Sequence, residues 1–393
     1  MKILGTIRQS VAHGSLGGME LVTHDLYRGL VEKGFEVLVL TTALKDSDEQ
    51  EKIVDGVKYI FIQESISGMY SNEYHRGVKV FFDKMAIEAN LPDIIHSASG
   101  AAASLLQNKE GVPVVATWHG TRLEEELDKL SDYAYIKKGK LLPFHFERLY
   151  LNGITKLVQQ NEFGKFDAHV AISPFMKQCI TSYGVHEAQT HVIRNSLPKY
   201  FSRQISKKNV VGNRIVLGLV GRLIPMKGHM FFAEVAKQLD PNKYQLLLIG
   251  AGESQDVYQN CGLEVSSVRV DRDKIPDMYR MMDIFVNPTF RYSGFDLTVQ
   301  EALASGVVTL VSDVTPYHEY FIELNERYGN QSPYYEFKVA DIESCLNAIN
   351  RIVVNKATNE HSDDFQKEFS FELMIDKYIA VFQKLKKERQ ADG

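Results

Sequence analysis

Short apolar runs alternate with longer amphipathic stretches along most of the chain. Runs rich in valine, isoleucine and leucine favour buried strands, and the stretches between them are long enough to form helices. Parallel strands need such crossover connections, so the alternation predicts an α/β fold with parallel sheets covered by helices. The runs that we expect to form strands are residues 3–7, 37–41, 57–62, 94–95, 114–117, 168–173, 192–193, 215–220, 246–249, 268–270, 284–286 and 307–311.

Apolar spacing predicts a helix near each end of the chain. Val22, Leu26 and Leu30 recur at four-residue intervals, which places them on one helical face. Gly34 marks the end of this first helix. The apolar residues of 369–385 follow similar spacing and predict an amphipathic terminal helix.

The length of the chain favours two domains. At 393 residues it exceeds what one hydrophobic core usually organises. Residues 197–213 are polar, basic and without a periodic pattern, and we interpret them as the domain boundary. We predict an N-terminal Rossmann-like domain over residues 1–200, a C-terminal Rossmann-like domain over residues 201–370 and a terminal helix over residues 371–393.

Composition and charge exclude several classes of protein. The net charge of −5 and the pI near 6.2 argue against nucleic acid as a partner, because binding to phosphates needs a basic surface. No apolar run approaches the roughly 18 residues of a membrane span, and the N-terminus lacks the apolar segment of a signal peptide. The three cysteines are far apart, so we expect no disulfide framework, no metal cluster and a reducing compartment.

The most informative stretch is NPTFRYSGFDLTVQEALASG, residues 287–306, which lies between two apolar runs. Asp296 stands where the N-cap of a helix belongs, and Gly306 stands where that helix would end. In parallel-sheet proteins ligands bind at the carboxyl ends of strands, where helix N-termini present unpaired N–H groups to anions. Glu301 lies among apolar residues on the face of the first turn, and we hypothesise that it binds sugar hydroxyls beside a bound phosphate. The alternative is a solvated or paired carboxylate.

Two cations occupy another loop at the end of a predicted strand. Arg222 and Lys227 are five residues apart in GRLIPMKG, residues 221–228. This spacing allows both to reach one diphosphate, where each charge-assisted hydrogen bond is worth about 1.5–3 kcal/mol. The alternative is a pair of surface ion pairs, each worth under about 1 kcal/mol.

The N-terminal half carries weaker signals of the same kind. Gly17 and Gly18 lie between the first strand and the first helix, where the backbone could approach a phosphate or a sugar closely. A tight turn is the alternative, and the pair does not complete the dinucleotide fingerprint. His119 follows the strand at 114–117 and is placed to face a cleft. The alternative is a structural histidine, which is the more common role of a lone histidine.

Asp271-Arg272-Asp273 has the D-x-D spacing that can hold a divalent cation through two carboxylates. We interpret it as part of a loop after the predicted strand at 268–270. We therefore expect no metal site there.

A basic and aromatic segment occupies residues 133–146. Such a mixture suits attachment to an anionic membrane surface, and the alternative is a partly buried helical pair with a solvated lysine face. We predict a cytoplasmic protein, with peripheral contact to the inner face of the membrane as one interpretation. The residues that would make this contact are Tyr133, Lys137, Lys138, Lys140 and Phe144.

Five motifs together resemble the retaining nucleotide-sugar glycosyltransferases of the GT-B fold. This group includes phosphatidylinositol mannosyltransferases and lipopolysaccharide core glucosyltransferases. The resemblance covers nearly the whole chain; the last three motifs are specific in their order, and the first two are weaker. The motifs are GGMELVTHDLYRGLVEKGFEVLVLTT, TWHG, VGRLIPMKG, NPTFRYSGFDLTVQEALASG and FSFELMIDKYIAVFQKL.

The resemblance implies two Rossmann-like domains that face a cleft and a C-terminal helix that returns to the N-terminal, acceptor-side domain. It implies that Arg222 and Lys227 bind the donor diphosphate and stabilise it as it leaves, and that His119 faces the donor sugar. These three are the expected catalytic residues, without a metal ion or a cofactor. The expected donor-binding residues are Gly17, Gly18, Arg222, Lys227, Val270, Ser293, Gly294, Phe295, Asp296, Leu297, Thr298 and Glu301.

One position departs from the family's pattern. The family usually has a glutamate eight residues before the second one, and here that position is Ser293. The family's following glycine is Asp296 here. Asp296 either caps the helix or reaches the sugar in place of the missing carboxylate.

The resemblance implies transfer of a hexose from a nucleoside diphosphate sugar to a hydroxyl acceptor, with retention at the anomeric carbon. The expected partners are the sugar nucleotide and a glycan or glycolipid acceptor of cell-surface polysaccharide or lipopolysaccharide synthesis. Two other interpretations stand beside it. One is a nucleotide-sugar epimerase of the same fold, and the other is a non-catalytic subunit that binds sugar nucleotides.

Overall fold

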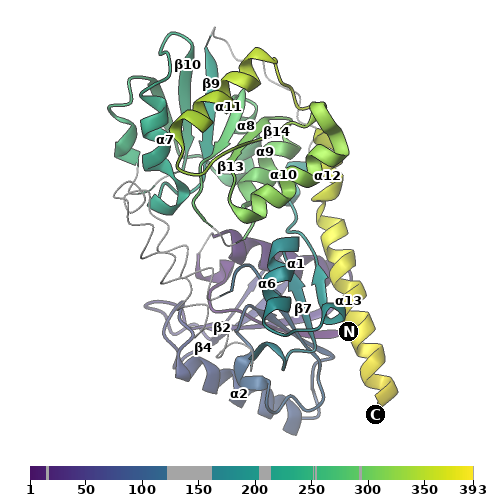
Figure 1. Ribbon diagram of the computed structural model, residues 1–393. Helices are drawn as coiled ribbons and strands as arrows, with labels where there is room; N and C mark the ends of the chain where they lie inside the picture. Colours follow the sequence, from purple (N-terminus) through teal and green to yellow (C-terminus); the bar gives the residue numbers. More distant parts are fainter. Residues whose placement is uncertain are drawn as a thin grey trace. The chain divides into compact units, whose positions relative to one another are not determined.

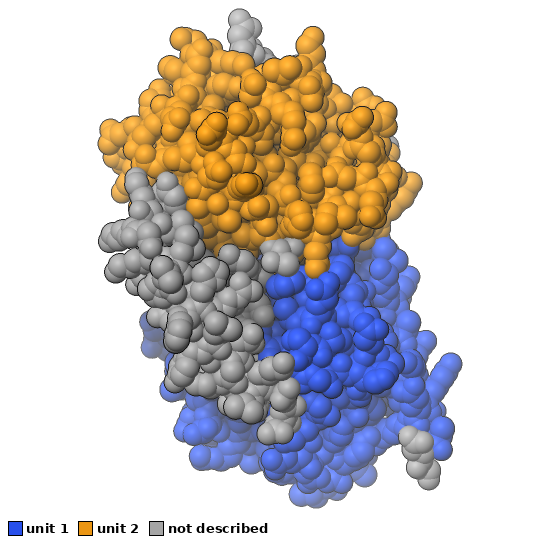
Figure 2. All heavy atoms as spheres, viewed as in Figure 1, with its two compact units in different colours: residues 1–121, 154–198, 370–393 blue, residues 122–153, 199–369 orange. Residues whose placement is uncertain are grey.

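The computed structural model describes residues 1–14, 17–121, 162–202, 214–250, 252, 255–291 and 294–392. These residues form two compact units (Figure 2). Each unit has its own sheet. The described parts of Met1–Thr121, Ile154–Pro198 and Ser370–Gly393 make up the first unit. The described parts of Lys199–Phe369 make up the second.

The first unit is built on an eight-stranded sheet in the order β3-β4-β2-β1-β5-β6-β7-β8. Figure 1 labels β2, β4 and β7 of this sheet. All neighbouring strands are parallel except β3 and β4, which pair as an antiparallel hairpin. The strands are β1 (Lys2–Thr6), β2 (Glu36–Thr42), β3 (Glu51–Val54), β4 (Val57–Ile62), β5 (Ile94–Ala98), β6 (Val114–Trp118), β7 (Ala168–Ala171) and β8 (Thr190–Val192). The α-helices of this unit among the described residues are α1 (Gly18–Glu32), α2 (Asn72–Ile87), α6 (Pro174–Ser182) and α13 (Phe371–Asp392).

The second unit contains a six-stranded sheet in the order β11-β10-β9-β12-β13-β14, with every neighbouring pair parallel. Its strands are β9 (Ile215–Val220), β10 (Tyr244–Ile249), β11 (Glu264–Val268), β12 (Ile284–Asn287), β13 (Val308–Ser312) and β14 (Tyr334–Phe337). Its α-helices among the described residues are α7 (His229–Ala236), α8 (Ile275–Tyr279), α9 (Leu297–Ala304), α10 (Thr315–Tyr328), α11 (Ile342–Val354) and α12 (Ser362–Glu368).

Helix α11 shows how local sequence produces these elements. The carboxylate of Asp341 accepts a hydrogen bond from the backbone N–H of Ser344 (2.9 Å), which caps the first turn. Cys345, Ala348 and Ile349 recur at helical spacing, and all three are buried against the sheet core. The cap fixes where the helix begins, and the apolar stripe fixes which face it buries.

The terminal helix α13 packs on α1 within the first unit. Gly29 of α1 allows this close approach, because a Cβ atom there would lie 2.5 Å from the Ile375 side chain. The hydroxyl groups of Tyr378 and Thr117 lie 2.9 Å apart, and Thr117 is in turn hydrogen-bonded to His96 (2.8 Å). The helix is therefore tied to strands β5 and β6 by buried polar contacts as well as by apolar packing.

The observed architecture confirms the predicted fold class of two parallel-sheet α/β units with a C-terminal helix. Strands β3 and β14 were not predicted, and the run at 268–270 was wrong, because β11 spans Glu264–Val268. All three strands lie at sheet edges. Edge strands expose one side to water, so they carry polar residues that interrupt the apolar run. None of the helices in the described parts of the chain is long and apolar enough to cross a membrane.

Candidate active site

Two loops of the second unit meet at the carboxyl edge of its sheet. Strand β9 runs into residues 221–228, and its neighbour β12 runs into residues 288–296. The backbone N–H of Phe290 donates to the Met226 carbonyl oxygen (3.0 Å), which ties the two loops together. Only glycine allows this close approach at position 228, because a Cβ atom there would lie 1.7 Å from the Pro288 carbonyl oxygen.

An ion cluster forms where these loops meet the first turn of α9. The Lys227 ammonium donates to Asp296 Oδ1 (2.5 Å), and Arg291 Nη1 lies 3.5 Å from the same oxygen. Asn287 Nδ2 donates to the other carboxylate oxygen, Oδ2 (3.1 Å). The side chains of Lys227 and Asp296 are only 17% and 13% exposed, so water screens this ion pair weakly.

Asp296 occupies the N-cap position of α9, as the sequence predicts, but its side chain makes no capping hydrogen bond. The carboxylate is turned toward Lys227 instead, so the interpretation of Asp296 as a side-chain cap is wrong. The backbone N–H of Asp296 donates to the Tyr317 hydroxyl (3.1 Å). This bond anchors the start of α9 to α10.

Mutual attraction keeps both members of the central pair ionised. Burial alone would raise the pKa of Asp296, but the charges of Lys227 and Arg291 outweigh it and hold that pKa well below its ordinary value. Burial lowers the pKa of Lys227, and Asp296 opposes this effect. Asp296 thus favours the charged form of a buried lysine.

Glu301 lies one turn further along α9 and is 6% exposed. The Tyr279 hydroxyl lies within hydrogen-bonding distance of Glu301 Oε2 (2.9 Å) and of the Thr298 carbonyl oxygen (3.1 Å). Burial raises the pKa of Glu301 to about 7, although the Tyr279 hydrogen bond and the positive charge of Arg272 act against the rise. The structure thus excludes the alternative of a solvated surface carboxylate.

Glu301→Gln should remove a pH dependence from the stability of the protein. Because its folded pKa lies above the ordinary value of 4.5, wild type is stabilised by this group below pH 4.5 and loses that stabilisation as the pH rises through about 7. The loss is about 1.4 kcal/mol per pH unit. Glutamine does not titrate, so the free energy of unfolding of the variant should rise relative to wild type across this range. Urea denaturation of both proteins near pH 4.5 and near pH 7 measures this difference in the free energy of unfolding. If the free energies of the two proteins changed with pH by the same amount, a buried Glu301 would be contradicted.

Other predicted residues of this unit offer either a charged side chain or backbone N–H groups to a ligand. Arg222 is exposed, and its positive charge acts on Lys227. Leu297 and Thr298 are the first two helical residues of α9, whose N–H groups have no acceptor within the helix. A Cβ atom at Gly221 would lie 4.0 Å from Thr298 Cγ2, which places this helix start beside the Arg222 loop.

Phe295 and its neighbours serve the fold more directly. The Phe295 ring packs against Tyr317 and Tyr320, with ring centroids 5.2 and 5.1 Å apart, so only its backbone is available to a donor. Gly294 is buried and has a left-handed φ of 71°. Val270 is half-buried and follows β11, and Ser293 lies outside the described residues.

The first unit holds Gly17, Gly18 and His119. Gly17 is the N-cap residue of α1 and Gly18 its first residue, and His119 follows β6. Because the strands around β1 and β6 are parallel, both positions lie at the carboxyl edge of the first sheet. Burial lowers the pKa of His119 to about 4, so its imidazole is neutral near pH 7.

The Asp271-Arg272-Asp273 segment forms a short 3-10 turn with Asp271 at its N-cap position. Asp273 lies 3.7 Å from the Lys274 ammonium, and Arg272 acts on Glu301. Across the described residues, no group of three histidine, cysteine or carboxylate side chains is arranged to hold a metal ion.

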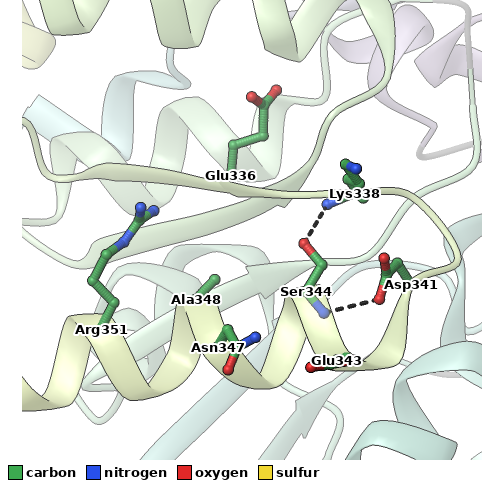
Figure 3. A pocket seen from close by; sticks show the side chains of 8 residues that line it. All are labelled: Glu336, Lys338, Asp341, Glu343, Ser344, Asn347, Ala348 and Arg351. Atoms are coloured by element: carbon green, nitrogen blue, oxygen red, sulfur yellow. Dashed lines mark hydrogen bonds between the residues drawn. The ribbon is translucent and has the colours of Figure 1, made fainter.

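A hollow of about 400 Å³ lies elsewhere on the second unit, between β14 and α11 (Figure 3). Two of its polar lining residues have partners: the Lys338 N–H donates to Ser344 Oγ (2.9 Å), and Glu336 pairs with His318 outside the hollow (2.9 Å). None of the predicted site residues lines it. We assign it no part in catalysis.

Comparisons with known proteins identify the family and the fold of the chain. The chain matches the family profile Glycosyltransferase Family 4 over residues 16–198 and the profile Glycosyl transferases group 1 over residues 214–355. It is 26% identical over 297 residues to the UDP-Gal:alpha-D-GlcNAc-diphosphoundecaprenol alpha-1,3-galactosyltransferase of Escherichia coli, which covers 68% of each chain.

Solved structures show the same fold. Sucrose-phosphate synthase from Thermosynechococcus elongatus matches with a TM-score of 0.73 and 17% identity over 98% of both chains. HepE of Anabaena, solved in complex with UDP-glucose, matches with a TM-score of 0.70 and 18% identity over 98% of this chain and 100% of its own. These likenesses define the fold as GT-B. The chain belongs to the group 1 glycosyltransferases, as its motifs predict, and it is an enzyme that takes a nucleotide sugar as its donor.

Four contributors to this site were not predicted from the sequence. They are Arg291 and Asn287, which contact Asp296, and Tyr279 and Tyr317, whose hydroxyls hold Glu301 and the start of α9. Arg291 and Asn287 lie within the stretch 287–306 that the sequence singles out, so their polarity beside a strand end was the available signal. The two tyrosines look like ordinary core residues in the sequence.

Proposed function

We propose that the enzyme transfers a hexose from UDP-hexose to a hydroxyl group of a glycan or glycolipid, with retention of configuration at the anomeric carbon. The observation that carries this proposal is the cationic cluster at the start of α9, with Lys227 and Arg291 beside a helix N-terminus and Glu301 one turn away. Positive groups and helix N–H groups suit a diphosphate, and a buried carboxylate suits ribose hydroxyls. The choice of UDP is supported by the Escherichia coli relative, whose name states a UDP-galactose donor.

In the proposed reaction the bond between the anomeric carbon and the diphosphate oxygen breaks, and the acceptor oxygen bonds to the same face of that carbon. The acceptor's proton passes to an oxygen of the departing diphosphate, so the products are a glycoside and UDP. Lys227, Arg222 and the N–H groups of Leu297 and Thr298 stabilise the negative charge that develops on the leaving group. The two cations supply the charge that a metal ion would otherwise supply.

The remaining site residues take supporting roles in this proposal. The neutral imidazole of His119 donates to or accepts from a hydroxyl of the donor sugar, and the backbone at Gly17 and Gly18 allows close approach of the substrates. Glu301 accepts hydrogen bonds from the ribose. Closure of the site around the donor excludes water, which competes with the acceptor for the sugar.

The acceptor that we propose is a lipid-linked or polymeric glycan of cell-surface polysaccharide or lipopolysaccharide synthesis, at the inner face of the membrane. Support comes from the Escherichia coli relative, whose name states an acceptor with a diphosphoundecaprenol group. The basic and aromatic residues from Tyr133 to Phe144 would contact the membrane, and they lie outside the described residues.

Calorimetry with UDP, GDP and ADP tests the donor, and proton NMR of the glycoside product tests the stereochemistry. We expect UDP to bind most tightly and the product to keep the anomeric configuration of the donor. Absence of binding by all three nucleotides would overturn the donor assignment. Interconversion of UDP-sugars without an acceptor would identify an epimerase, and binding without turnover on any acceptor would identify a non-catalytic subunit.

A further inference from the structure

We propose that Asp296 is a positioning residue for Lys227: its carboxylate holds the ammonium group charged and aimed at the donor diphosphate. This inference rests on the function proposed above and assigns a purpose to the position where the family's glycine is replaced. The geometry points to it because the carboxylate sits between the two loops and gathers side chains from both.

The bonding of Asp296 argues against its two other interpretations. Its Oδ1 oxygen receives Lys227 and lies near Arg291, while Oδ2 receives the amide of Asn287. These partners use most of the acceptor capacity of a carboxylate, which leaves little for a sugar hydroxyl. The carboxylate also makes no bond to the N–H groups of its own helix. Asp296 therefore neither caps the helix nor faces open solvent. Its contacts are with cations, and we infer that its role is to act on them.

The arrangement solves an electrostatic problem. Lys227 and Arg291 approach the same carboxylate oxygen and repel each other, and burial disfavours the charged form of Lys227. One carboxylate between them leaves the cluster with two positive charges and one negative charge, so it still attracts an anion. An ammonium group has three N–H donors, so Lys227 can keep its bond to Asp296 and still donate to a phosphate oxygen.

The charge of Lys227 depends on few neighbours. Arg291 from the same loop as Asp296, and Arg222 from the loop after β9, both lower the pKa of Lys227, as does burial. His229, at the start of α7, has its own pKa lowered to about 4 by burial and is neutral near pH 7. Asp296 is thus the neighbour that favours the charged lysine, and its removal should let Lys227 lose its proton at lower pH.

Asp296→Asn tests the proposal, since it preserves shape and removes only the charge. We expect turnover at saturating donor to fall about tenfold to a hundredfold, which is less than the roughly 10²–10³ for removing a transition-state donor, because Lys227 itself remains. We also expect the basic limb of the kcat/KM profile, which reports groups of the free enzyme, to move to lower pH. Asp256→Asn, which removes an exposed carboxylate of the same unit, should change neither quantity.

A second variant keeps the proposal testable where Asp296→Asn fails to fold. Asn287→Ala retains every charge but removes the amide that orients the carboxylate, so it should lower turnover several-fold without moving the basic limb. Turnover within about twofold of wild type in Asp296→Asn, or an unmoved basic limb, would overturn the positioning role, as would unchanged turnover in Asn287→Ala. The wild-type protein separates this failure from a failure of the proposed function. If wild type binds UDP and transfers sugar in the same assays, the proposed function is retained. If wild type does neither, the proposed function itself is overturned.

Discussion

Lys227→Ala should lower turnover at saturating donor by about two orders of magnitude, close to 2.7 kcal/mol of transition-state stabilisation. The ammonium group lies at the junction of the two loops, where the negative charge of a departing diphosphate would develop. Its side chain is only 17% exposed, so little water is available to replace the lost charge. Steady-state kinetics with UDP-sugar at saturation measures the effect.

Lys237→Ala is the matched control for this variant. Lys237 follows α7 in the same unit and pairs with Glu234 at 2.9 Å, with a side chain that is 44% exposed. Exposed ion pairs contribute little, so this variant should keep wild-type turnover. Near-normal turnover of Lys227→Ala, with Lys237→Ala also normal, would remove Lys227 from the mechanism.

Gly228→Ala should destabilise the second unit by about 3–5 kcal/mol and abolish most activity, because it combines backbone strain with a steric clash. Gly228 has a φ of 76°, which disfavours any side chain, and its Cβ atom would meet the Pro288 carbonyl oxygen at 1.7 Å. That oxygen belongs to the loop that carries Arg291, so relief of the clash must separate the two halves of the ion cluster. Urea denaturation followed by far-ultraviolet circular dichroism measures the loss of stability.

Gly262→Ala isolates the backbone contribution. Gly262 has a similar φ of 82°, but nothing lies within 4 Å of the Cβ position. This variant should therefore show only the left-handed strain of about 1–2 kcal/mol and keep its activity. Equal effects of the two variants would show that the contact with Pro288 has no energetic weight.

Fluorescence adds a second control, because the chain has a single tryptophan, Trp118, at the end of β6 in the first unit. Trp118 is buried and stacks on Phe163, with ring centroids 4.3 Å apart, so its emission reports the packing of that unit. Gly228→Ala should shift the circular dichroism transition more than the fluorescence transition. A larger shift of the fluorescence transition would place the damage in the first unit.

The central strands of both sheets were predictable from the sequence, and several of the edge strands were not. Strands such as β1 and β9 are flanked by neighbours on both sides, so their residues form apolar runs that stand out in the sequence. Strand β11 reads Glu-Val-Ser-Ser-Val and is largely exposed, so its sequence resembles a loop. Its position is fixed by pairing with β10, which is a contact that no local pattern encodes.

The candidate site divides in the same way. Lys227, Asp296 and Glu301 stand out because each is charged and lies at a loop or helix start that follows a strand. The partners of these residues do not stand out, since Lys227 and Asp296 are 69 positions apart and Tyr279 and Glu301 are 22 apart. In Asp296 a local interaction competes with a tertiary one. Its position favours capping the helix, but the buried ammonium group of Lys227 is a stronger partner for the carboxylate.

The packing of α13 on α1 sets the order in which the two units can complete their folding during synthesis. The ribosome delivers residues 199–369 before residues 371–392, so the second sheet can close while the α1 surface around Gly29 is still bare. Ile375 can reach that surface only after residues 199–369 have been made, because α13 follows them in the sequence. The first unit is therefore completed only after the second unit has been made, and until then the nascent chain carries an uncovered apolar face of α1.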